Sequence, residues 1–242
     1  MGWLKKSARA ASLKEATEQA EAIYAPFLRK ASDDPYHVTL PDFCARCAAI
    51  PNYSILEIGS RAVSGTTRRH LFPTAERYVG LDIHEGPGVD LIGDAHGLST
   101  IFSPNEFDAV FSVSVFEHLA FPWKAVMEIN TVLKPGGLCY LSTHPNWPPH
   151  EQPWDFWRFP VAGLHLLFSP PLGFAVIRSA EGIPGKVHSL VDEAPTRGLC
   201  DFELPLGVSL LAQKVGDYDR EKIRWDVPLS SVLKTEYPAP LS

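Results

Sequence analysis

The stretch Tyr53-Ser-Ile-Leu-Glu57-Ile-Gly59-Ser60-Arg61-Ala-Val-Ser-Gly65 decides how this chain folds. Ile55, Leu56 and Ile58 make an apolar run that is too short for a buried helix and has the length of a buried strand. Gly59 follows at once, and glycine tolerates the backbone angles that turn a chain sharply from a strand into a loop. A strand, a glycine turn and a helix together form the unit with which a doubly wound sheet holds a nucleotide-like ligand.

The rest of the chain continues this alternation of strands and helices. Further strands are predicted at Arg77–Asp82, Val89–Ile92, Phe107–Val113, Leu138–Ser142, Phe174–Ser179 and Val208–Lys214. Helices are predicted at Ser12–Lys30, Asp42–Ile50, Thr66–Leu71, Pro122–Leu133 and Val161–Phe168. Strands that alternate with helices and short loops imply a parallel sheet with right-handed crossovers. We therefore expect an α/β fold, with residues 1–40 as an N-terminal helical extension and residues 41–242 as a single domain.

The composition narrows the class of protein further. The 242 residues are 45% hydrophobic, enough for a full core, and carry a net charge of -6. A negative charge argues against non-specific nucleic-acid binding, which depends on Lys and Arg neutralising phosphates. No run reaches the ~18 apolar residues of a membrane span and the N-terminus has no apolar signal core, so we expect a cytoplasmic protein without a membrane partner. Cys44-x-x-Cys47 lacks a second pair at zinc-ribbon spacing, which favours two small apolar residues packed on a helix.

Acidic residues stand where the predicted strands end. Asp82 closes the second strand, and Asp94 follows the third. The carboxyl ends of parallel strands form one edge of the sheet, where open α/β folds bind their ligands. Two carboxylates near a low-dielectric rim are costly unless hydrogen-bond donors meet them, and a ribose diol and an amine are suitable donors.

These segments resemble the motifs of the class I S-adenosylmethionine (SAM)-dependent methyltransferases. Glu57-Ile-Gly59 is similar to the family's first motif, acidic-x-Gly-x-Gly-x-Gly, with Arg61 where the second Gly normally stands. Phe107–Ser112 matches the fourth motif, the Glu-His pair of Phe116–Leu119 is common in the small-molecule branch, and Leu133–Gly137 matches the stop before the fifth strand. The resemblance implies a Rossmann-like, doubly wound sheet of seven strands that ends in a hairpin. The N-terminal helix and a Trp/Pro-rich loop after strand five are additions to it.

The resemblance also implies SAM as the cofactor and gives roles to individual residues. Asp82 matches the acidic residue that binds both ribose hydroxyls, and Ile83 would lie against the adenine. Asp94 and Ala95 match the family's adenine clamp, in which the carboxylate accepts from the amino group and a backbone N–H donates to the ring. The cofactor-binding residues expected on this basis are Glu57, Gly59, Ser60, Arg61, Gly65, Asp82, Ile83, Asp94, Ala95 and Ser112.

The departure from the motif at Arg61 has two interpretations. The arginine binds the methionine carboxylate of the cofactor through its planar fork of donors, or it points to solvent. A nicotinamide cofactor also places its ribose on an acidic residue about 20 positions past a glycine loop. That interpretation fits less well, because Gly-x-Gly-x-x-Gly is absent from this sequence.

A hydroxyl acceptor of the methyl group needs a base whose pKa lies near the working pH, and histidine meets this need. His144 ends the fifth strand and is the first candidate, with His118 second and His150 third. The loop Thr143–Pro160 offers aromatic faces that can stack on sugars, rings or cations. The residues expected to contact the acceptor are His150, Trp154, Asp155, Trp157 and Arg158. A Trp-Asp-Phe-Trp-Arg run of this kind is similar to methyltransferases of bacterial sugar and secondary-metabolite pathways, which implies O-methylation of a small polar acceptor.

Two further interpretations come from other classes of protein. One is a non-catalytic SAM-fold subunit that supports a partner enzyme, which the departure at Arg61 favours. The other is a metal hydrolase. Its candidate ligands are Asp94, His96, His118, His144, His150 and Asp155. None of them has the spacing of a helix-borne metal motif, so no metal is expected. These patterns specify neither the acceptor nor the oligomeric state.

Overall fold

The structure, a computed structural model, describes residues 2–63 and 65–225, so that Ser64 of the glycine loop lies outside the described residues. It contains two compact units, which divide between Asp34 and Pro35. The division predicted after residue 40 falls inside helix α2 (Tyr36–Ala48), which belongs to the second unit. The boundary lies before α2 because the buried side chains of this helix are part of the core of the second unit.

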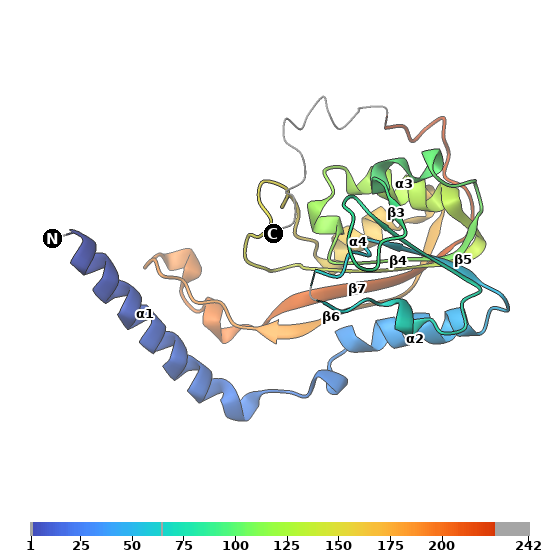
Figure 1. The fold of residues 1–242 in the computed structure, drawn as a ribbon. Coiled ribbons are helices and arrows are strands. Elements are labelled where there is room, and N and C mark those ends of the chain that lie inside the picture. The colour runs from blue at the N-terminus through green and yellow to red at the C-terminus, as the bar shows by residue number, and fades with distance from the viewer. Residues whose placement is uncertain (1, 64, 226–242) are drawn as a thin grey trace. The chain divides into compact units, whose positions relative to one another are not determined.

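The first unit holds helix α1 (Gly2–Tyr24), drawn in dark blue in Figure 1. The prediction of a helix over Ser12–Lys30 is wrong at both ends. Ser12 lies inside the helix, which begins at Gly2. The helix ends before Pro26, because proline lacks the backbone N–H and its ring clashes with the preceding turn of a helix.

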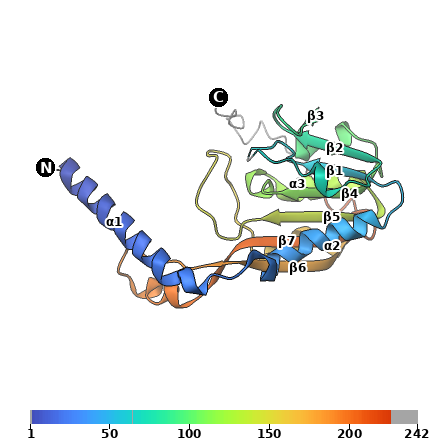
Figure 2. The same cartoon turned by 60° about the horizontal axis from the view of Figure 1, so that its bottom comes forward.

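The second unit is built on a sheet of seven strands in the order β3-β2-β1-β4-β5-β7-β6, which Figure 2 shows side by side. The strands are β1 (Ser54–Ile58), β2 (Arg77–Asp82), β3 (Leu91–Ile92), β4 (Phe107–Val113), β5 (Leu133–Thr143), β6 (Phe174–Gly185) and β7 (Leu204–Lys214). β1 to β5 run parallel, whereas β7 is antiparallel to both β5 and β6. The predicted Rossmann-like, doubly wound sheet that ends in a hairpin is confirmed.

The bounds of the strands follow from how they pair. β2 and β4 begin and end where the sequence predicts, because their apolar runs lie inside a parallel sheet that is covered on both faces. β6 and β7 extend beyond their predicted ranges, since the antiparallel hairpin continues as far as the pair Gly185 and Leu204. β5 begins before its predicted start, at Leu133, which pairs with Phe107 before an irregularity in the ladder.

Helices cover both faces of the sheet (Figure 1). α2 packs on one face, where Phe43 and Cys47 are buried in a cluster with Phe111. Burial raises the pKa of the Cys47 thiol to about 12, so it stays protonated and packs as the small apolar residue that the sequence predicts. α3 (Pro122–Val132) and α4 (Val161–Leu167) pack on the other face. Among residues 2–63 and 65–225, no helix combines the length and the apolar character needed to cross a membrane.

The helix predicted at Thr66–Leu71 is wrong. This segment forms only the 3₁₀ turn Arg69–Leu71. It is confined between the left-handed turn at Gly65, with a φ of 82°, and Pro73. So few residues cannot repay the cost of nucleating a helix, and the loop after β1 stays irregular along the edge of the sheet.

Candidate functional site

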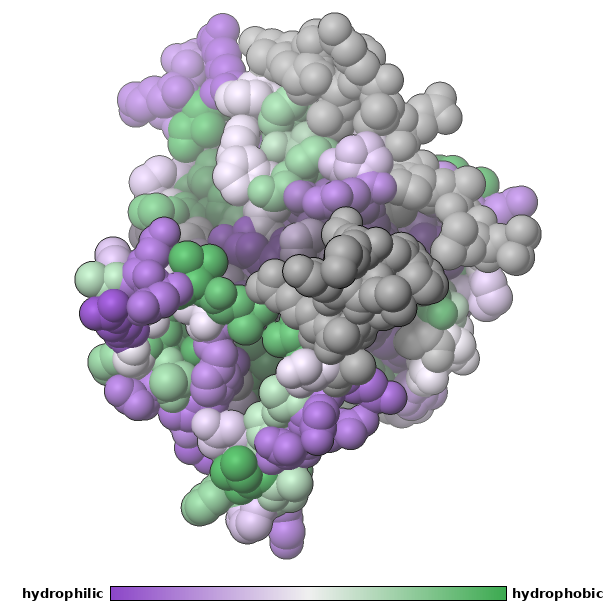
Figure 3. All heavy atoms as spheres, turned by 90° about the vertical axis from the view of Figure 1, so that its left-hand side faces the viewer, coloured by the Kyte–Doolittle hydropathy of each residue, from purple (hydrophilic) through white to green (hydrophobic). Residues whose placement is uncertain are grey.

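A cavity of about 340 Å³ opens at the edge of the sheet where the parallel strands end. Figure 3 looks onto this edge and shows hydrophilic residues set among hydrophobic ones. The walls come from the segments that follow β1, β2, β3 and β4, together with the loop between β5 and α4. The lining includes Gly59, Arg61, Asp82, Ile83, Asp94, Ala95, His118, His150 and Trp154.

The turn after β1 requires glycine at position 59. Gly59 has a φ of 79°, a left-handed conformation that residues with a Cβ rarely adopt. A Cβ there would stand 2.1 Å from Cγ2 of Val115, so the segment after β4 touches this turn directly. The Gly59 N–H donates to the Leu81 carbonyl at 2.8 Å. These contacts bring the ends of β1, β2 and β4 together at the cavity.

Asp82, at the end of β2, is held by its neighbours. One carboxylate oxygen accepts the His84 N–H at 3.0 Å, and the other accepts the Arg61 N–H at 3.2 Å. The Arg61 side chain lies over the same carboxylate, with Nε 3.6 Å from Oδ1. Only 13% of the Arg61 side chain is exposed, so it does not point to solvent. Its ion pair with Asp82 is an arrangement that neither interpretation of the sequence anticipated.

Asp94, which follows β3, is held by His96. The His96 backbone N–H donates to Asp94 Oδ1 at 2.9 Å, and the ring Nδ1 lies 2.6 Å from the same oxygen. Burial alone would raise the pKa of the Asp94 carboxyl, but the hydrogen bonds from His96 bring it below its ordinary value. Since the ring Nε2 accepts the Phe121 N–H at 3.2 Å, both His96 nitrogens are engaged and neither is available to a metal. Asp94 is thus an ionised acceptor on the cavity wall, beside Ile83 and Ala95.

Two residues of the expected cofactor set face the protein interior instead. Glu57 is buried, accepts the Tyr78 hydroxyl and pairs with Arg68 at 3.3 Å. Burial raises the pKa of the Glu57 carboxyl, and the hydrogen bond from Tyr78 opposes this rise. Ser112 donates its hydroxyl to the Ile58 carbonyl at 3.1 Å. Neither side chain lines the cavity, because each is used to join β1 to a neighbouring strand.

Ser60 and Gly65 also lie outside the cavity lining. The Ser60 side chain is buried against Gly80, where an added Cβ would stand 2.8 Å from Ser60 Oγ. Gly65 adopts the left-handed conformation, and an added Cβ would meet no other atom of the described chain within 4 Å. The turn itself therefore requires glycine at position 65, not a close contact.

The loop between β5 and α4 supplies a second wall. Trp154 is buried and lines the cavity together with His150 and His118. The His118 ring Nδ1 lies 2.6 Å from the Trp154 carbonyl oxygen, which fixes the histidine against this loop. Of the residues predicted to contact the acceptor, His150 and Trp154 are the ones that reach the cavity.

Asp155, Trp157 and Arg158 shape the loop instead of lining the cavity. Arg158 holds Asp155 with two hydrogen bonds, Nη1 to Oδ1 at 2.6 Å and Nη2 to Oδ2 at 2.8 Å, and also donates to the Trp147 carbonyl. The guanidinium beside it lowers the pKa of the Asp155 carboxyl to about 2. Trp157 donates its indole N–H to the Leu119 carbonyl at 2.9 Å. Because these groups satisfy one another, they fix the course of the loop.

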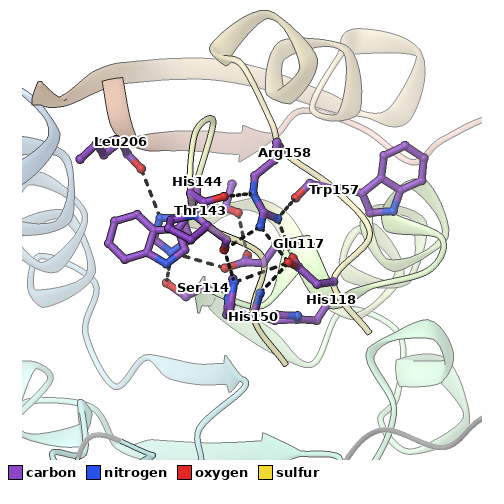
Figure 4. A network of polar contacts seen from close by, with 12 residues as sticks. Ser114, Glu117, His118, Thr143, His144, His150, Trp157, Arg158 and Leu206 are labelled. Carbon is purple, nitrogen blue, oxygen red and sulfur yellow. Dashed lines mark hydrogen bonds and ion pairs between the residues drawn. The ribbon is translucent and has the colours of Figure 1, made fainter. Parts of the chain in front are cut away.

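Glu117 is a site residue that the sequence-based prediction missed. It is fully buried, accepts the Thr143 hydroxyl at 2.7 Å and lies with Oε1 3.5 Å from Nε2 of His144. Figure 4 shows Glu117 gathered with His118, His144 and His150 in one polar cluster. His144 does not line the cavity. The signal for Glu117 was its place directly before His118, in the Glu-His pair that follows β4.

The fold and the cavity define an α/β protein with a candidate ligand site at the carboxyl edge of its sheet. Asp82 and Asp94 offer hydrogen-bond acceptors at the tips of adjacent strands, and Ile83 and Leu119 add apolar surface to the same cavity. Such a set fits a ligand that combines ribose hydroxyls, an amine and a flat ring.

Comparison with known proteins supports the same interpretation. Residues 56–141 match the family model of the methyltransferase domain. This match and the fold support a class I SAM-dependent methyltransferase, for which SAM is the cofactor. The strand tips described above lie within or directly beside the matched residues. No curated protein sequence matches the chain.

Several solved structures share the fold. A SAM-dependent methyltransferase from Archaeoglobus fulgidus has a TM-score of 0.52 at 15% identity, over 73% of this chain and 92% of that chain. A chain from the complex between the Haloferax volcanii Trm112 methyltransferase activator and the putative methyltransferase has a TM-score of 0.50 at 22% identity, over 73% of this chain and 88% of that chain. The [4+2]-cyclase SpnF has a TM-score of 0.51 at 18% identity, over 73% of this chain and 81% of that chain. At these identities the likeness shows the fold alone.

Proposed function

We propose that this chain transfers the methyl group of SAM to a hydroxyl of a small polar acceptor, as an O-methyltransferase of a sugar or secondary-metabolite pathway. The observation that carries the proposal is a single cavity with two different walls. The cofactor wall contains Asp82, Ile83, Asp94 and Ala95, and the histidine wall contains His118, His150 and Trp154. Carboxylates on one wall and imidazoles on the other suit a reaction that needs a held cofactor and a deprotonated acceptor.

The cofactor wall is suited to the adenosyl group. Asp82 accepts from the ribose hydroxyls, and Asp94 accepts from the adenine amine while Ile83 and Ala95 lie against the ring. Bound SAM supplies an electrophilic methyl group on a sulfonium that leaves with its electron pair. The task of the chain is therefore to orient the acceptor and to exclude water from the methyl group. Buried Trp154 offers an apolar face for both purposes.

The histidine wall supplies the base that takes the proton of the acceptor hydroxyl. His118 becomes the first candidate for this base, since it lines the cavity and His144 does not. The Trp154 carbonyl can only accept a hydrogen bond, so His118 Nδ1 carries the hydrogen and Nε2 carries the basic lone pair. His144 becomes the second candidate, acting from beside Glu117.

The test uses the purified full-length chain with labelled SAM and a panel of sugar, phenol and alcohol acceptors. We expect transfer of the label to a hydroxyl, with release of an equal amount of S-adenosylhomocysteine. Asp82→Asn should weaken SAM binding roughly 10- to 100-fold, because the loss of a charged hydrogen-bond acceptor costs about 1.5–3 kcal/mol. The matched control is Glu85→Gln, an exposed carboxyl group in the loop after β2, which should leave the affinity unchanged. Equal affinities for the two variants would contradict the proposal.

A non-catalytic SAM-fold subunit is the second candidate, and the position of Arg61 favours it. The Arg61 side chain competes with ribose hydroxyls for the Asp82 carboxylate. One similar structure comes from a complex with a methyltransferase activator and another is a cyclase, so the fold by itself does not require methyl transfer. Such a subunit binds SAM weakly and labels no acceptor in the panel, whereas the enzyme labels at least one.

A further inference from the structure

We propose that Glu117, His118 and His150 bind a divalent transition-metal ion on the histidine wall of the cavity. Each of the three residues offers one ligand atom, and these atoms lie within 4.8 Å of one another. Glu117 and His118 belong to the turn that follows β4, and His150 belongs to the loop that follows β5. His144 borders this cluster, with its Nε2 3.5 Å from Glu117 Oε1 (Figure 4). Side chains from separate segments of the chain therefore converge on one point.

One oxygen of the buried Glu117 carboxylate lacks a hydrogen-bond partner among the described residues. Glu117 is 0% exposed, and a buried carboxylate is costly unless donors or an opposite charge meet its oxygens. Oε2 accepts the Thr143 hydroxyl. Oε1 has no hydrogen-bond partner among the residues that the structure describes, and the group nearest to it in the cluster is the His144 ring at 3.5 Å. A cation beside Oε1 supplies the missing partner.

Backbone carbonyls orient the histidine rings of the cluster. In each ring Nδ1 faces a backbone carbonyl, at 2.6 Å for His118, 3.2 Å for His144 and 3.1 Å for His150. A carbonyl oxygen only accepts, so each Nδ1 carries a hydrogen and each neutral ring has its lone pair on Nε2. Histidines that bind metals share this arrangement, in which the second ring nitrogen donates to a carbonyl or a carboxylate.

His144 stands at the border of this cluster. Its Nε2 lies 3.5 Å from Glu117 Oε1 and 3.3 Å from the Ser114 hydroxyl oxygen, which can donate a hydrogen bond to this nitrogen. The proposed ligands are therefore Glu117, His118 and His150, whose ligand atoms lie close together.

The loop between β5 and α4 holds His150 in place. Asp155 accepts the His150 backbone N–H at 2.9 Å, and its Oδ2 lies 3.6 Å from the ring Nδ1. Arg158 neutralises Asp155 through its two hydrogen bonds, so Asp155 positions the histidine and is not itself a ligand. The ligand set is therefore one carboxylate with imidazole nitrogens.

This ligand set selects the type of metal. Imidazoles with one carboxylate suit Zn²⁺, Co²⁺ and related ions, whereas Ca²⁺ and Mg²⁺ prefer oxygen-rich sites. Bonds of ~2.1 Å to one ion place its ligand atoms roughly 3–4 Å apart, so side-chain shifts of about 1 Å close this cluster on the ion. One consequence rests on the proposed function. An acceptor hydroxyl that binds the ion has a lowered pKa, and His118 then serves as a ligand and not as the base.

The metal alone tests the site. The full-length protein is stripped with a chelator, Co²⁺ is titrated while the visible absorption is recorded, and Zn²⁺ binding is measured by calorimetry. We expect one Co²⁺ per chain, with the absorption bands of a four- or five-coordinate site. Glu117→Gln and His150→Asn should each weaken Co²⁺ binding by at least about 10-fold. The matched control is His165→Asn in α4, whose ring contacts Ser179 outside the cluster, and it should bind Co²⁺ like the wild type.

The absence of Co²⁺ bands in the wild-type protein, or an equal Co²⁺ affinity in Glu117→Gln, overturns the proposal. If circular dichroism shows that Glu117→Gln is unfolded, the Co²⁺ affinity of His150→Asn tests the proposal instead. The His150 side chain is 31% exposed, so its replacement leaves no buried charge. SAM calorimetry on the same samples separates the two proposals. Binding of SAM without metal overturns only the metal site. Binding of metal without SAM overturns only methyl transfer, and favours the metal hydrolase.

Discussion

The cofactor wall and the histidine wall of the cavity are built in different ways. Each carboxylate of the cofactor wall accepts a backbone N–H from two positions away, that of His84 for Asp82 and that of His96 for Asp94, and Arg61 from the turn after β1 also holds Asp82. The histidine wall joins His118, which follows β4, to His150, which follows β5. Short motifs can therefore encode most of the first wall, with the exception of the contacts of Arg61. The second exists only after the sheet has placed β4 and β5 side by side.

The largest effect on stability is expected at Gly59, where the cofactor wall meets β4. Gly59→Ala adds left-handed strain and a clash with Val115, so the free energy of unfolding should fall by about 3 kcal/mol in urea denaturation. Gly136→Ala is the matched control, because Gly136 has the same φ of 79° but an open surrounding within the described chain. Its cost should be only about 1 kcal/mol. Equal losses in the two variants would show that the contact with Val115 carries no energy.

A smaller effect on stability is expected at Asp155, in the loop that carries His150 and Trp154 of the histidine wall. Asp155→Asn should lower the free energy of unfolding by about 2 kcal/mol at pH 7, because Arg158 loses its charged partner. The folded pKa of Asp155 is about 2, below the ~3.9 of an unfolded chain. The contribution is therefore present above about pH 4 and is lost as the pH falls toward 2.

Urea denaturation of the wild type and Asp155→Asn between pH 7 and pH 2.5 checks this prediction. The difference in stability should shrink as the pH falls. A difference that stays constant over the whole range would mean that the charge of Asp155 is not its source. Asp192→Asn is the control, since Asp192 forms an exposed pair with Arg197, and it should change stability by less than about 0.5 kcal/mol.

The smallest effect is expected at Arg61, and its direction is informative. If the ion pair competes with the ribose hydroxyls for Asp82, Arg61→Ala should tighten SAM binding by about 3-fold, or ~0.6 kcal/mol. Calorimetry with SAM measures this directly. Weaker binding would instead support the interpretation in which Arg61 holds the methionine carboxylate of the cofactor.

The same contrast explains how much of the site could be predicted from the sequence. Asp82, Ile83, Asp94 and Ala95 were expected at the cavity and line it, because each follows a strand that hydrophobic periodicity locates. The two-residue period of a strand determines the face to which its last residue points, so a short stretch of sequence is enough to place that residue at the edge of the sheet. The strands β2 and β4 were predicted to the residue for the same reason.

The remaining features depend on contacts between distant segments. The sequence shows that Asp155 and Arg158 are polar, but not that they satisfy each other and so leave the cavity to Trp154. Glu117 gained a role only when Thr143 and the loop histidines were placed beside it. Composition and spacing do not reveal such contacts, because they form only when the folded sheet brings distant segments together.

The central claim is that Asp82 and Asp94 together hold one adenosyl group, and a crystal structure with bound S-adenosylhomocysteine tests it most directly. We predict the Asp82 carboxylate at about 2.6–3.0 Å from both ribose hydroxyls, and the Asp94 carboxylate at about 3 Å from the adenine amine. A ligand that lodges elsewhere while both carboxylates face water would contradict the claim.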